Sequence, residues 1–499
     1  MGNRAVNNKM NIWGISANSH DAAVSVWHDK ELKFAAHSER YSGVKNDGDL
    51  CPGILEEAYT FGKPDLVVWY ENPKLKSARQ FYAGQGDRTE ENDVAAYLSG
   101  YNIDAPIFYG EHHKSHAAAG YYTSGFEDAT VIVIDSIGEF ETLTVWQGHG
   151  NDLRRVYTQN YPDSVGLWFS AMTQRIGLKP NEEEYILMGM AAYGDANKYK
   201  ADIYNDFFAS INGPEIKFKR NLHRGCPDWR LDLLSQQDTF DLAAATQAIY
   251  EELLQGISRW ARKTLPSKNV VLMGGCALNC VANSTISGDW EKMWIMPNPG
   301  DAGSSVGAVA AYFGEQVTWP GAYLGTDMGG PYPVEETIDV LKTQKIVGLA
   351  SGRAEFGPRA LGHRSLLADP RGPEIKDTVN AIKRRQKFRP FAPAILEEHV
   401  HEYFDMPAGI TASPYMQFVA RCTKPEEFPA IIHGDGTSRV QTVSKDDSPG
   451  FRKLLENWYS ETGCPMLLNT SLNIKGMPMV NNIEDAQAFE SKYNVKVLS

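Results

Sequence analysis

The run Ala-Thr-Val-Ile-Val-Ile-Asp at positions 129–135 is almost wholly apolar and rich in β-branched residues. A strand of this composition is typical of the centre of a sheet that is covered on both faces. Three shorter β-rich runs at 11–16, 22–27 and 32–37 have tight connections and predict an antiparallel meander. The sheet that contains the strand at 129–135 must therefore have other elements packed on both of its faces.

Helical patterns separate the predicted strands. An alanine-rich helix is expected over about 112–122, and a long amphipathic helix over about 240–265, where apolar residues recur at steps of three or four. The long helix leads into a predicted strand at 269–273. Strands mixed with helices in this order indicate α/β layers.

The length of 499 residues is too great for one ordinary core, and roughly 100–200 residues per domain suggests two to four domains. A segment rich in Gly and Pro at 318–333 marks the clearest boundary, because a fresh helix-then-strand pattern follows it. We therefore expect one domain at 1–330 and a second at 331–499. No internal repeat is visible in the sequence.

The chain is acidic, with 62 Asp and Glu against 49 Lys and Arg and a net charge of −13. This balance argues against a protein that coats nucleic acid by bulk electrostatics, although it does not exclude a local basic patch. The six cysteines form no Cys-x-x-Cys pair, the first residues are polar, and no apolar stretch approaches the roughly 18 residues of a membrane span. We expect a cytoplasmic protein.

Three histidines lie close together in the segment Glu-His-His-Lys-Ser-His at 111–116. On a helix, His112 and His116 share one face, so both imidazoles could reach one metal ion. Oxygen ligands would come from elsewhere, and Asp135 and Asp301 are candidates because they follow a strand and occupy a glycine-rich loop. The alternative is a histidine pair that only hydrogen-bonds neighbouring loops.

Glycine-rich turns recur in the first domain, at 188–194, 274–279 and 300–303. Glycine lets backbone amides approach phosphate oxygens, and three such turns together favour nucleotide binding. None matches a Walker loop or a dinucleotide fingerprint.

Cations concentrate in the second domain, at 352–364, 369–371 and 383–389. Arginine suits bidentate contact with phosphate. These cations are interleaved with Gly, Pro and Phe rather than spaced along a helix, which favours a loop around an anion over a solvated basic face. Segments 433–442 and 468–473 add hydroxyls and amides.

Together these segments resemble the NodU/CmcH-type O-carbamoyltransferases over almost the whole chain. The matching blocks lie at 14–23, 38–40, 112–119, 188–194, 274–283, 299–303, 355–365, 388–393, 435–443 and 468–473. The resemblance implies a two-lobed N-terminal domain of the actin/Hsp70/sugar-kinase (ASKHA) type, similar to the tRNA threonylcarbamoylation enzyme. It implies a C-terminal α/β domain that is YrdC-like.

In such a family, the C-terminal domain combines carbamoyl phosphate with ATP to give carbamoyl-adenylate and pyrophosphate. The N-terminal domain then transfers the carbamoyl group to an acceptor hydroxyl and releases AMP. The resemblance therefore implies an ATP-dependent carbamoyltransferase with Mg²⁺ accompanying ATP.

The matching motifs also imply roles for single residues. His20 lies where the family's acid/base histidine does and would take the proton from the acceptor hydroxyl. One divalent metal, Fe²⁺ or Zn²⁺, would be held by His112, His116, Asp135 and Asp301. The adenylate would be held in the first domain by Gly189, Gly274, Gly275 and Asn279. Carbamoyl phosphate and the ATP phosphates would be held in the second domain by Lys383, Arg389, Arg439 and Ser471.

The acceptor stays open at this point. A sugar, an antibiotic or a nucleoside-type alcohol would each present a suitable hydroxyl, and a hydroxymethylated base in nucleotides or DNA is the minority alternative. A tRNA threonylcarbamoylation-type enzyme is a further alternative. A hydrogenase-maturation carbamoyltransferase would need paired Cys-x-x-Cys motifs, which this sequence lacks. The non-enzymatic alternative is a nucleotide-gated binding module, and a homodimer is a further expectation.

The sequence departs from the family pattern at two positions. The motif Asp-Gly-x-Gly-Glu reads Asp-Ser-Ile-Gly-Glu at 135–139, so Ser136 replaces a glycine. The usual proline of the alanine-tyrosine loop is Ala192. Neither position is one of the proposed metal ligands.

Overall fold

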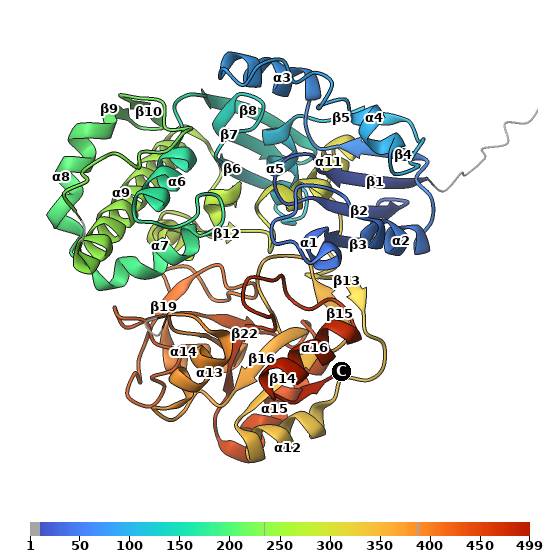
Figure 1. Ribbon diagram of the computed structural model, residues 1–499, viewed down its shortest axis with the longest axis vertical. Coiled ribbons are helices and arrows are strands. Elements are labelled where there is room, and N and C mark those ends of the chain that lie inside the picture. Colours follow the sequence, from blue (N-terminus) through green and yellow to red (C-terminus); the bar gives the residue numbers. More distant parts are fainter. Residues whose placement is uncertain (1–9, 234, 387–388) are drawn as a thin grey trace, which may run out of the picture.

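The computed structural model describes residues 10–233, 235–386 and 389–499 (Figure 1). Its first sheet has the strand order β3-β2-β1-β4-β5. The first three strands form the predicted antiparallel meander, and β4 and β5 extend the sheet in parallel from β1. The bounds are β1 Asn11–Ser16, β2 Ala23–His28, β3 Glu31–His37, β4 Leu66–Trp69 and β5 Ile107–Tyr109.

A second sheet repeats this arrangement in the order β8-β7-β6-β11-β12. Again three antiparallel strands are extended by two parallel ones. This duplication is not visible in the sequence, because the strand order is repeated but the amino-acid sequence is not. The bounds are β6 Asp128–Ile134, β7 Glu141–His149, β8 Asp152–Asn160, β11 Asn269–Met273 and β12 Lys292–Trp294.

Strand β6 confirms the prediction of a central strand with two covered faces. Val131 and Val133 join the core that contains α5 (His112–Tyr121) and α11 (Ser304–Phe313), which lie between the two sheets. Ile132 and Ile134 alternate with them and join the core of the long helix α9 (Gln236–Thr264). Period-two alternation thus sends successive side chains into two different cores.

The other helices of this part cover the outer faces and edges. The long helix α9 begins with a capping box in which Ser235 and Asp238 satisfy each other's backbone N–H groups. The remaining elements are α1 Glu39–Ser42, α2 Pro52–Thr60, α3 Pro73–Tyr82, α4 Val94–Ser99, α6 Val165–Arg175, α7 Glu184–Met190, α8 Ala196–Phe207, α10 Cys280–Ile286, β9 Phe208–Asn212 and β10 Glu215–Phe218.

The C-terminal part is built on a six-stranded mixed sheet in the order β21-β17-β22-β16-β14-β23. Two cores cover its faces, one with α12 and α15 and the other with α13 and α16. The sheet strands are β14 Ile346–Ala350, β16 Arg364–Ala368, β17 Ala392–Leu396, β21 Gln441–Val443, β22 Met466–Ser471 and β23 Val497–Leu498. The helices are α12 Val334–Gln344, α13 Ile375–Lys383, α14 Val400–Tyr403, α15 Pro449–Thr462 and α16 Ile483–Tyr493.

Small sheets complete this part and join it to the rest. Strand β13 (Tyr323–Asp327) pairs with β15 (Arg353–Glu355), so a segment before residue 330 pairs with the C-terminal part. A separate three-stranded sheet contains β18 Phe404–Asp405, β19 Val419–Cys422 and β20 Thr437–Arg439. The domain limits of 1–330 and 331–499 stay a prediction.

The α/β class predicted from the sequence is confirmed by these sheets and helices. The duplicated strand order is the two-lobed arrangement that the ASKHA resemblance implied, while the YrdC-like assignment stays a prediction. Within the described residues, every helix is too short or too polar to cross a bilayer. The polar residues 1–9 lie outside the described residues.

Candidate active site

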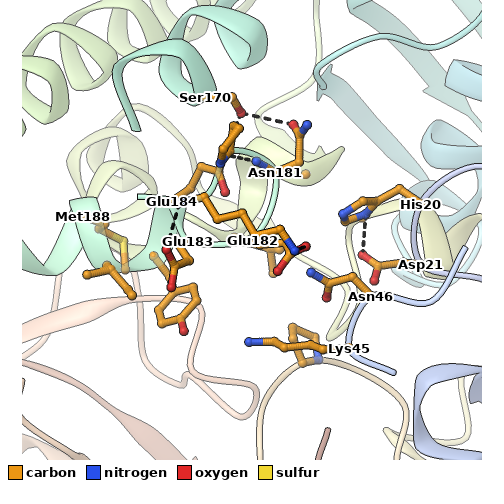
Figure 2. A pocket seen from close by; sticks show the side chains of 18 of the residues that line it. His20, Asp21, Lys45, Asn46, Ser170, Asn181, Glu182, Glu183, Glu184 and Met188 are labelled. Carbon is orange, nitrogen blue, oxygen red and sulfur yellow. Dashed lines mark hydrogen bonds and ion pairs between the residues drawn. The ribbon is translucent and has the colours of Figure 1, made fainter. Parts of the chain in front are cut away.

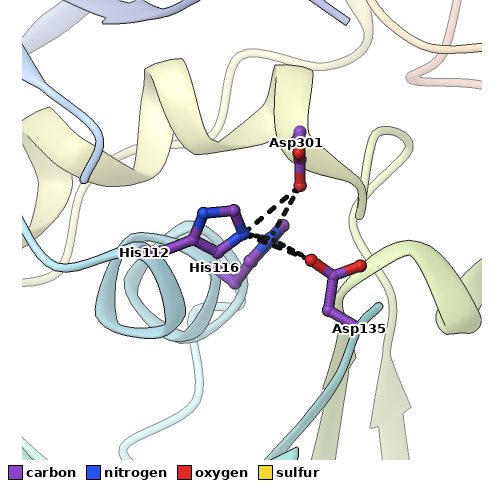
Figure 3. Close-up of side chains that lie close together, drawn as sticks. All are labelled: His112, His116, Asp135 and Asp301. Carbon is purple, nitrogen blue, oxygen red and sulfur yellow. Dashed lines mark hydrogen bonds and ion pairs between the residues drawn. The ribbon is translucent and has the colours of Figure 1, made fainter. Parts of the chain in front are cut away.

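Four side chains meet between the two N-terminal sheets (Figure 3), and we call them the histidine–aspartate cluster: His112, His116, Asp135 and Asp301. One potential ligand atom from each lies within 4.8 Å of the others. Nε2 of His112 lies 3.2 Å from Oδ2 of Asp135, and Nε2 of His116 lies 3.2 Å from Oδ1 of Asp301. The structure therefore brings all four predicted ligands together.

The positions of these ligands follow from the elements that carry them. His112 and His116 occupy one face of α5, four residues apart, and Asp135 directly follows β6. Glu139 lies at the end of the same short loop, and its carboxylate accepts the backbone N–H of His112 at 3.0 Å. The carboxylate therefore caps the N-terminus of α5, where the helix dipole favours negative charge.

The donor atoms of the cluster fit a divalent cation. Nε2 of His112 and Nε2 of His116 are 3.1 Å apart, so two protons cannot both occupy the space between the rings. Burial lowers the pKa of His116, but its hydrogen bonds to the two aspartates outweigh burial and raise it. A cation among two carboxylates and two neutral imidazoles would replace those protons, and this N₂O₂ donor set suits zinc or iron.

His20 projects into a cavity beside the cluster (Figure 2) from the loop between β1 and β2. Its Nδ1 lies 3.0 Å from Oδ2 of Asp21, and its Nε2 is buried without a recorded hydrogen-bond partner in the described structure. Burial lowers the pKa of His20, but Asp21 and, more weakly, Asp301 outweigh burial and raise it to about 9. Asp21 thus fixes the ring orientation and favours the protonated form.

The cavity beside His20 has a volume of about 1600 Å³ and is lined by both parts of the chain. His20, Asp135 and Asp301 lie on its N-terminal side. Lys383 and Arg439 lie on its C-terminal side. One cavity therefore contacts the histidine–aspartate cluster and the predicted phosphate-binding residues.

The four residues predicted to hold the adenylate are divided. Gly275 and Asn279 line the large cavity, and Asn279 also caps α10 by accepting the N–H of Ala282. Gly189 lines a second cavity of about 420 Å³ instead. Gly274 lines neither; its φ of 87° and close approach to Ile134 give it a backbone role.

The four residues predicted to hold phosphates all line the large cavity. Nζ of Lys383 donates to the carbonyl oxygen of Ser471 at 2.5 Å and to its hydroxyl at 3.3 Å. Burial and the nearby arginines lower the pKa of Lys383 well below its usual value. The Lys383 ammonium is therefore held among neutral oxygens and has no neutralising carboxylate in the described chain.

We call Lys383 and the four arginines beside it the arginine wall: Arg359, Arg385, Arg389, Arg439 and Lys383. Within the described chain, none of the four guanidinium groups forms an ion pair with a carboxylate. Burial and the charge of Arg439 lower the pKa of Arg359 to about 9, and burial and Arg389 lower that of Arg385 to about 8. Such crowding of partly buried cations favours binding of a polyanion. Lys387 and Phe388 of the predicted cation segment lie outside the described residues.

Sequence reasoning missed several residues of this site. Arg359 and Arg385 stand inside the arginine-rich segments but were not singled out among their neighbours. Lys45, labelled in Figure 2, faces the ring of Tyr185 at 5.4 Å. Arg389 faces the same ring at 5.0 Å. Nothing local marks Lys45, because only the tertiary fold brings it to the arginine wall.

Comparison with known proteins places the chain among its relatives. Residues 88–310 match the family description "Carbamoyltransferase N-terminus", and residues 338–499 match "Carbamoyltransferase C-terminus". The nodulation protein NolNO of Sinorhizobium fredii is 30% identical, over 94% of this chain and 76% of that protein. The chain belongs to the carbamoyltransferase family. It is therefore an enzyme, and the predicted family resemblance is confirmed.

Two further comparisons show weaker similarity. The 3'-hydroxymethylcephem-O-carbamoyltransferase of Amycolatopsis lactamdurans is 27% identical to this carbamoyltransferase, over 93% of this chain and 94% of that protein. Among solved structures, HypF of T. kodakarensis is 14% identical with a TM-score of 0.33, covering 61% of this chain and 47% of that one. The fold class rests on the strand order rather than on this weak structural likeness.

Proposed function

We propose that the protein is an O-carbamoyltransferase that uses carbamoyl phosphate and ATP to carbamoylate an acceptor hydroxyl. The observation that carries this proposal is the single cavity of about 1600 Å³ between the arginine wall and the histidine–aspartate cluster. One side of the cavity suits phosphates and the other suits a carbonyl group under attack. The sequence relationship to a named O-carbamoyltransferase supports the same chemistry.

The arginine wall is proposed to form the activated intermediate. Water releases phosphate from carbamoyl phosphate, and an oxygen of the resulting carbamate attacks the α-phosphorus of ATP. The bond from that phosphorus to the bridging oxygen breaks, so that carbamoyl-adenylate and pyrophosphate form. Arg439, Arg389 and Lys383 bind the phosphoryl oxygens, Ser471 positions Lys383, and Mg²⁺ accompanies ATP.

The N-terminal side of the cavity is proposed to carry out transfer. His20 accepts the proton of the acceptor hydroxyl through the nitrogen that Asp21 leaves free, and the hydroxyl oxygen attacks the carbamoyl carbon. The bond to the adenylate oxygen breaks and AMP leaves. A divalent metal, Fe²⁺ or Zn²⁺, held by the histidine–aspartate cluster supplies Lewis acidity at the carbonyl oxygen. Gly275 and Asn279 line the part of the cavity proposed for the adenylate.

The acceptor is proposed to be a small molecule with a free hydroxyl group. The hydroxymethyl group named for the cephem enzyme is one such acceptor, and it supports this class by relationship only. In this proposal residues 1–330 carry transfer and residues 331–499 carry adenylation.

The decisive experiment separates the two half-reactions. Purified protein with Zn²⁺ or Fe²⁺, Mg²⁺, ATP and carbamoyl phosphate should release AMP and pyrophosphate, and AMP release should rise with a suitable acceptor. His20→Asn should retain carbamoyl-phosphate-dependent ATP–pyrophosphate exchange within about threefold and lose transfer by roughly 10²–10⁴-fold. Absence of AMP and pyrophosphate under every condition would refute the reaction, and loss of both half-reactions in His20→Asn would refute the division of labour.

A further inference from the structure

Glu71 is a buried carboxylate directly behind the histidine–aspartate cluster. It follows β4, and its side chain is 4% exposed. Its Oε2 lies 3.6 Å from Nδ1 of His112, on the edge of the ring opposite the cluster. This separation is that of an ion pair rather than a hydrogen bond, so the carboxylate acts through its charge. It favours a proton on Nδ1 and thereby leaves Nε2 to face a metal.

Lys76 connects Glu71 to a different segment of the chain. Its Nζ lies 2.6 Å from Oε1 of Glu71 and donates to the backbone carbonyl of Asn18 at 2.7 Å. The ammonium group is as buried as its partner, and desolvation makes a buried ion pair a weak source of stability. Apolar side chains could fill the same volume, so stability alone does not account for the pair.

The carbonyl that Lys76 binds belongs to the loop at 17–22, which carries His20. The loop turns through the left-handed region at Asn18, where φ is 58°. Its shape depends on contacts with other elements, among them the 2.8 Å hydrogen bond from the N–H of Asn18 to the carbonyl of Gly48. The side-chain amide of Asn18 donates to the carbonyl of Glu91 at 2.7 Å, and Lys76 adds a third anchor at the same residue.

These contacts form a continuous path from His112 through Glu71 and Lys76 to Asn18. We propose that Glu71 and Lys76 are positioning residues that couple metal binding at the histidine–aspartate cluster to the placement of the His20 loop. The catalytic role of His20 comes from the proposed function, on which this proposal rests. The proposal adds which contacts hold the metal ligands and His20 in fixed positions relative to each other. The coupling is reciprocal, because the same two links act in both directions.

The first link is tested by metal affinity in the full-length protein. Metal-free wild type, Glu71→Gln and Lys268→Met are titrated with Zn²⁺ against a chelator. Lys268 is the matched control, because its 2.6 Å pair with Glu291 is exposed. We expect Glu71→Gln to bind Zn²⁺ roughly 10–100-fold more weakly, while the control stays within twofold. Circular dichroism confirms that the near-isosteric Glu71→Gln variant is folded.

The second link is tested by the reactivity of His20. Metal-free wild type, Lys76→Met and Lys268→Met are treated with diethyl pyrocarbonate, and modification of the His20 peptide is followed by mass spectrometry. We expect His20 to react at least threefold faster in Lys76→Met, because the loop loses an anchor. Should Lys76→Met not fold, Lys76→Leu, which also lacks an N–H donor, serves in the same assay.

Either an unchanged Zn²⁺ affinity in Glu71→Gln or an unchanged His20 reactivity in the folded Lys76 variant overturns the proposal, because coupling needs both links. A purely structural role would lower thermal stability without moving Zn²⁺ affinity. Neither measurement uses carbamoyl phosphate. A wild-type protein without carbamoyl transfer would therefore refute the proposed function and leave this test intact.

Discussion

The two sides of the cavity differ in how their charges are balanced. The histidine–aspartate cluster sets two carboxylates against two imidazoles, and each imidazole has a further partner behind it, Glu71 or Ser304. The arginine wall gathers five cations without a carboxylate partner in the described chain. The charges of the histidine–aspartate cluster are arranged in advance for a cation. The arginine wall, in contrast, becomes electrostatically favourable only when an anion binds.

The largest expected effect comes from removing a carboxylate from the histidine–aspartate cluster. Asp135→Asn removes one carboxylate oxygen from the cluster, so metal affinity should fall at least 100-fold and transfer by roughly 10²–10³-fold. Carbamoyl-phosphate-dependent ATP–pyrophosphate exchange should stay within about threefold. Metal content and the two rates measure this. Equal loss of exchange and transfer would show that the two sides do not work separately.

A pH profile tests the same separation with a smaller effect. A base acts when unprotonated, and with a pKa of about 9 only roughly 1% of His20 is unprotonated at pH 7. Transfer should therefore rise roughly tenfold per pH unit from 7 to about 9, while exchange does not follow this curve. Asp21→Asn removes the main cause of the raised pKa, so the rising limb should move to lower pH. Identical profiles for transfer in the wild type and Asp21→Asn would contradict the role of His20.

Removing one cation from the arginine wall should weaken substrate binding while it stabilises the ligand-free protein. Arg385→Met should raise the KM for carbamoyl phosphate roughly tenfold by removing one positive charge of the arginine wall. The same change should raise the Tm of the ligand-free protein by roughly 1–3 °C, because it removes a partly buried cation that its neighbours repel. Arg88→Met, at an exposed arginine paired with Glu91, is the control. A lower Tm in Arg385→Met would mean that the positive charges of the arginine wall are already compensated in the ligand-free protein.

The smallest effect is expected where the sequence departs from its family. Ser136→Gly restores the usual residue in the loop after β6. Because the side chain of Ser136 makes no recorded hydrogen bond in the described structure, transfer should stay within about threefold. The backbone entropy of glycine should lower stability by roughly 0.5–1 kcal/mol, measurable by urea unfolding. A change in transfer above tenfold would show that Ser136 contacts a substrate.

Local patterns were sufficient to predict several elements of the fold. The strand predicted at 269–273 coincides with β11, and the helix predicted at 112–122 ends one residue earlier as α5. The strand is a short apolar run that leads into Gly274, and the helix is rich in alanine, a strong helix former. Local patterns could not predict the duplication of the sheets, which only the family resemblance implied, because tertiary packing preserves strand order under quite different sequences.

The candidate site was predictable only where short motifs carry the chemistry. The spacing of His112 and His116 fixes a shared helix face, so their meeting could be anticipated. Glu71 gave a weaker signal, a carboxylate just after a strand, and Lys76 gave none. Whether a lysine on one helix reaches a loop 58 positions away depends on packing that no local pattern encodes.

The short loop at 135–139 sets a fixed spacing between a strand and a helix. Asp135 at its start supplies a cluster oxygen, and Glu139 at its end caps α5, which carries both histidines. A Cβ at Gly138 would lie 3.0 Å from the ring of His113, so the loop already packs tightly on the helix. Related chains can therefore exchange the residue at 136, but an insertion or deletion within the loop would displace three of the four ligands at once.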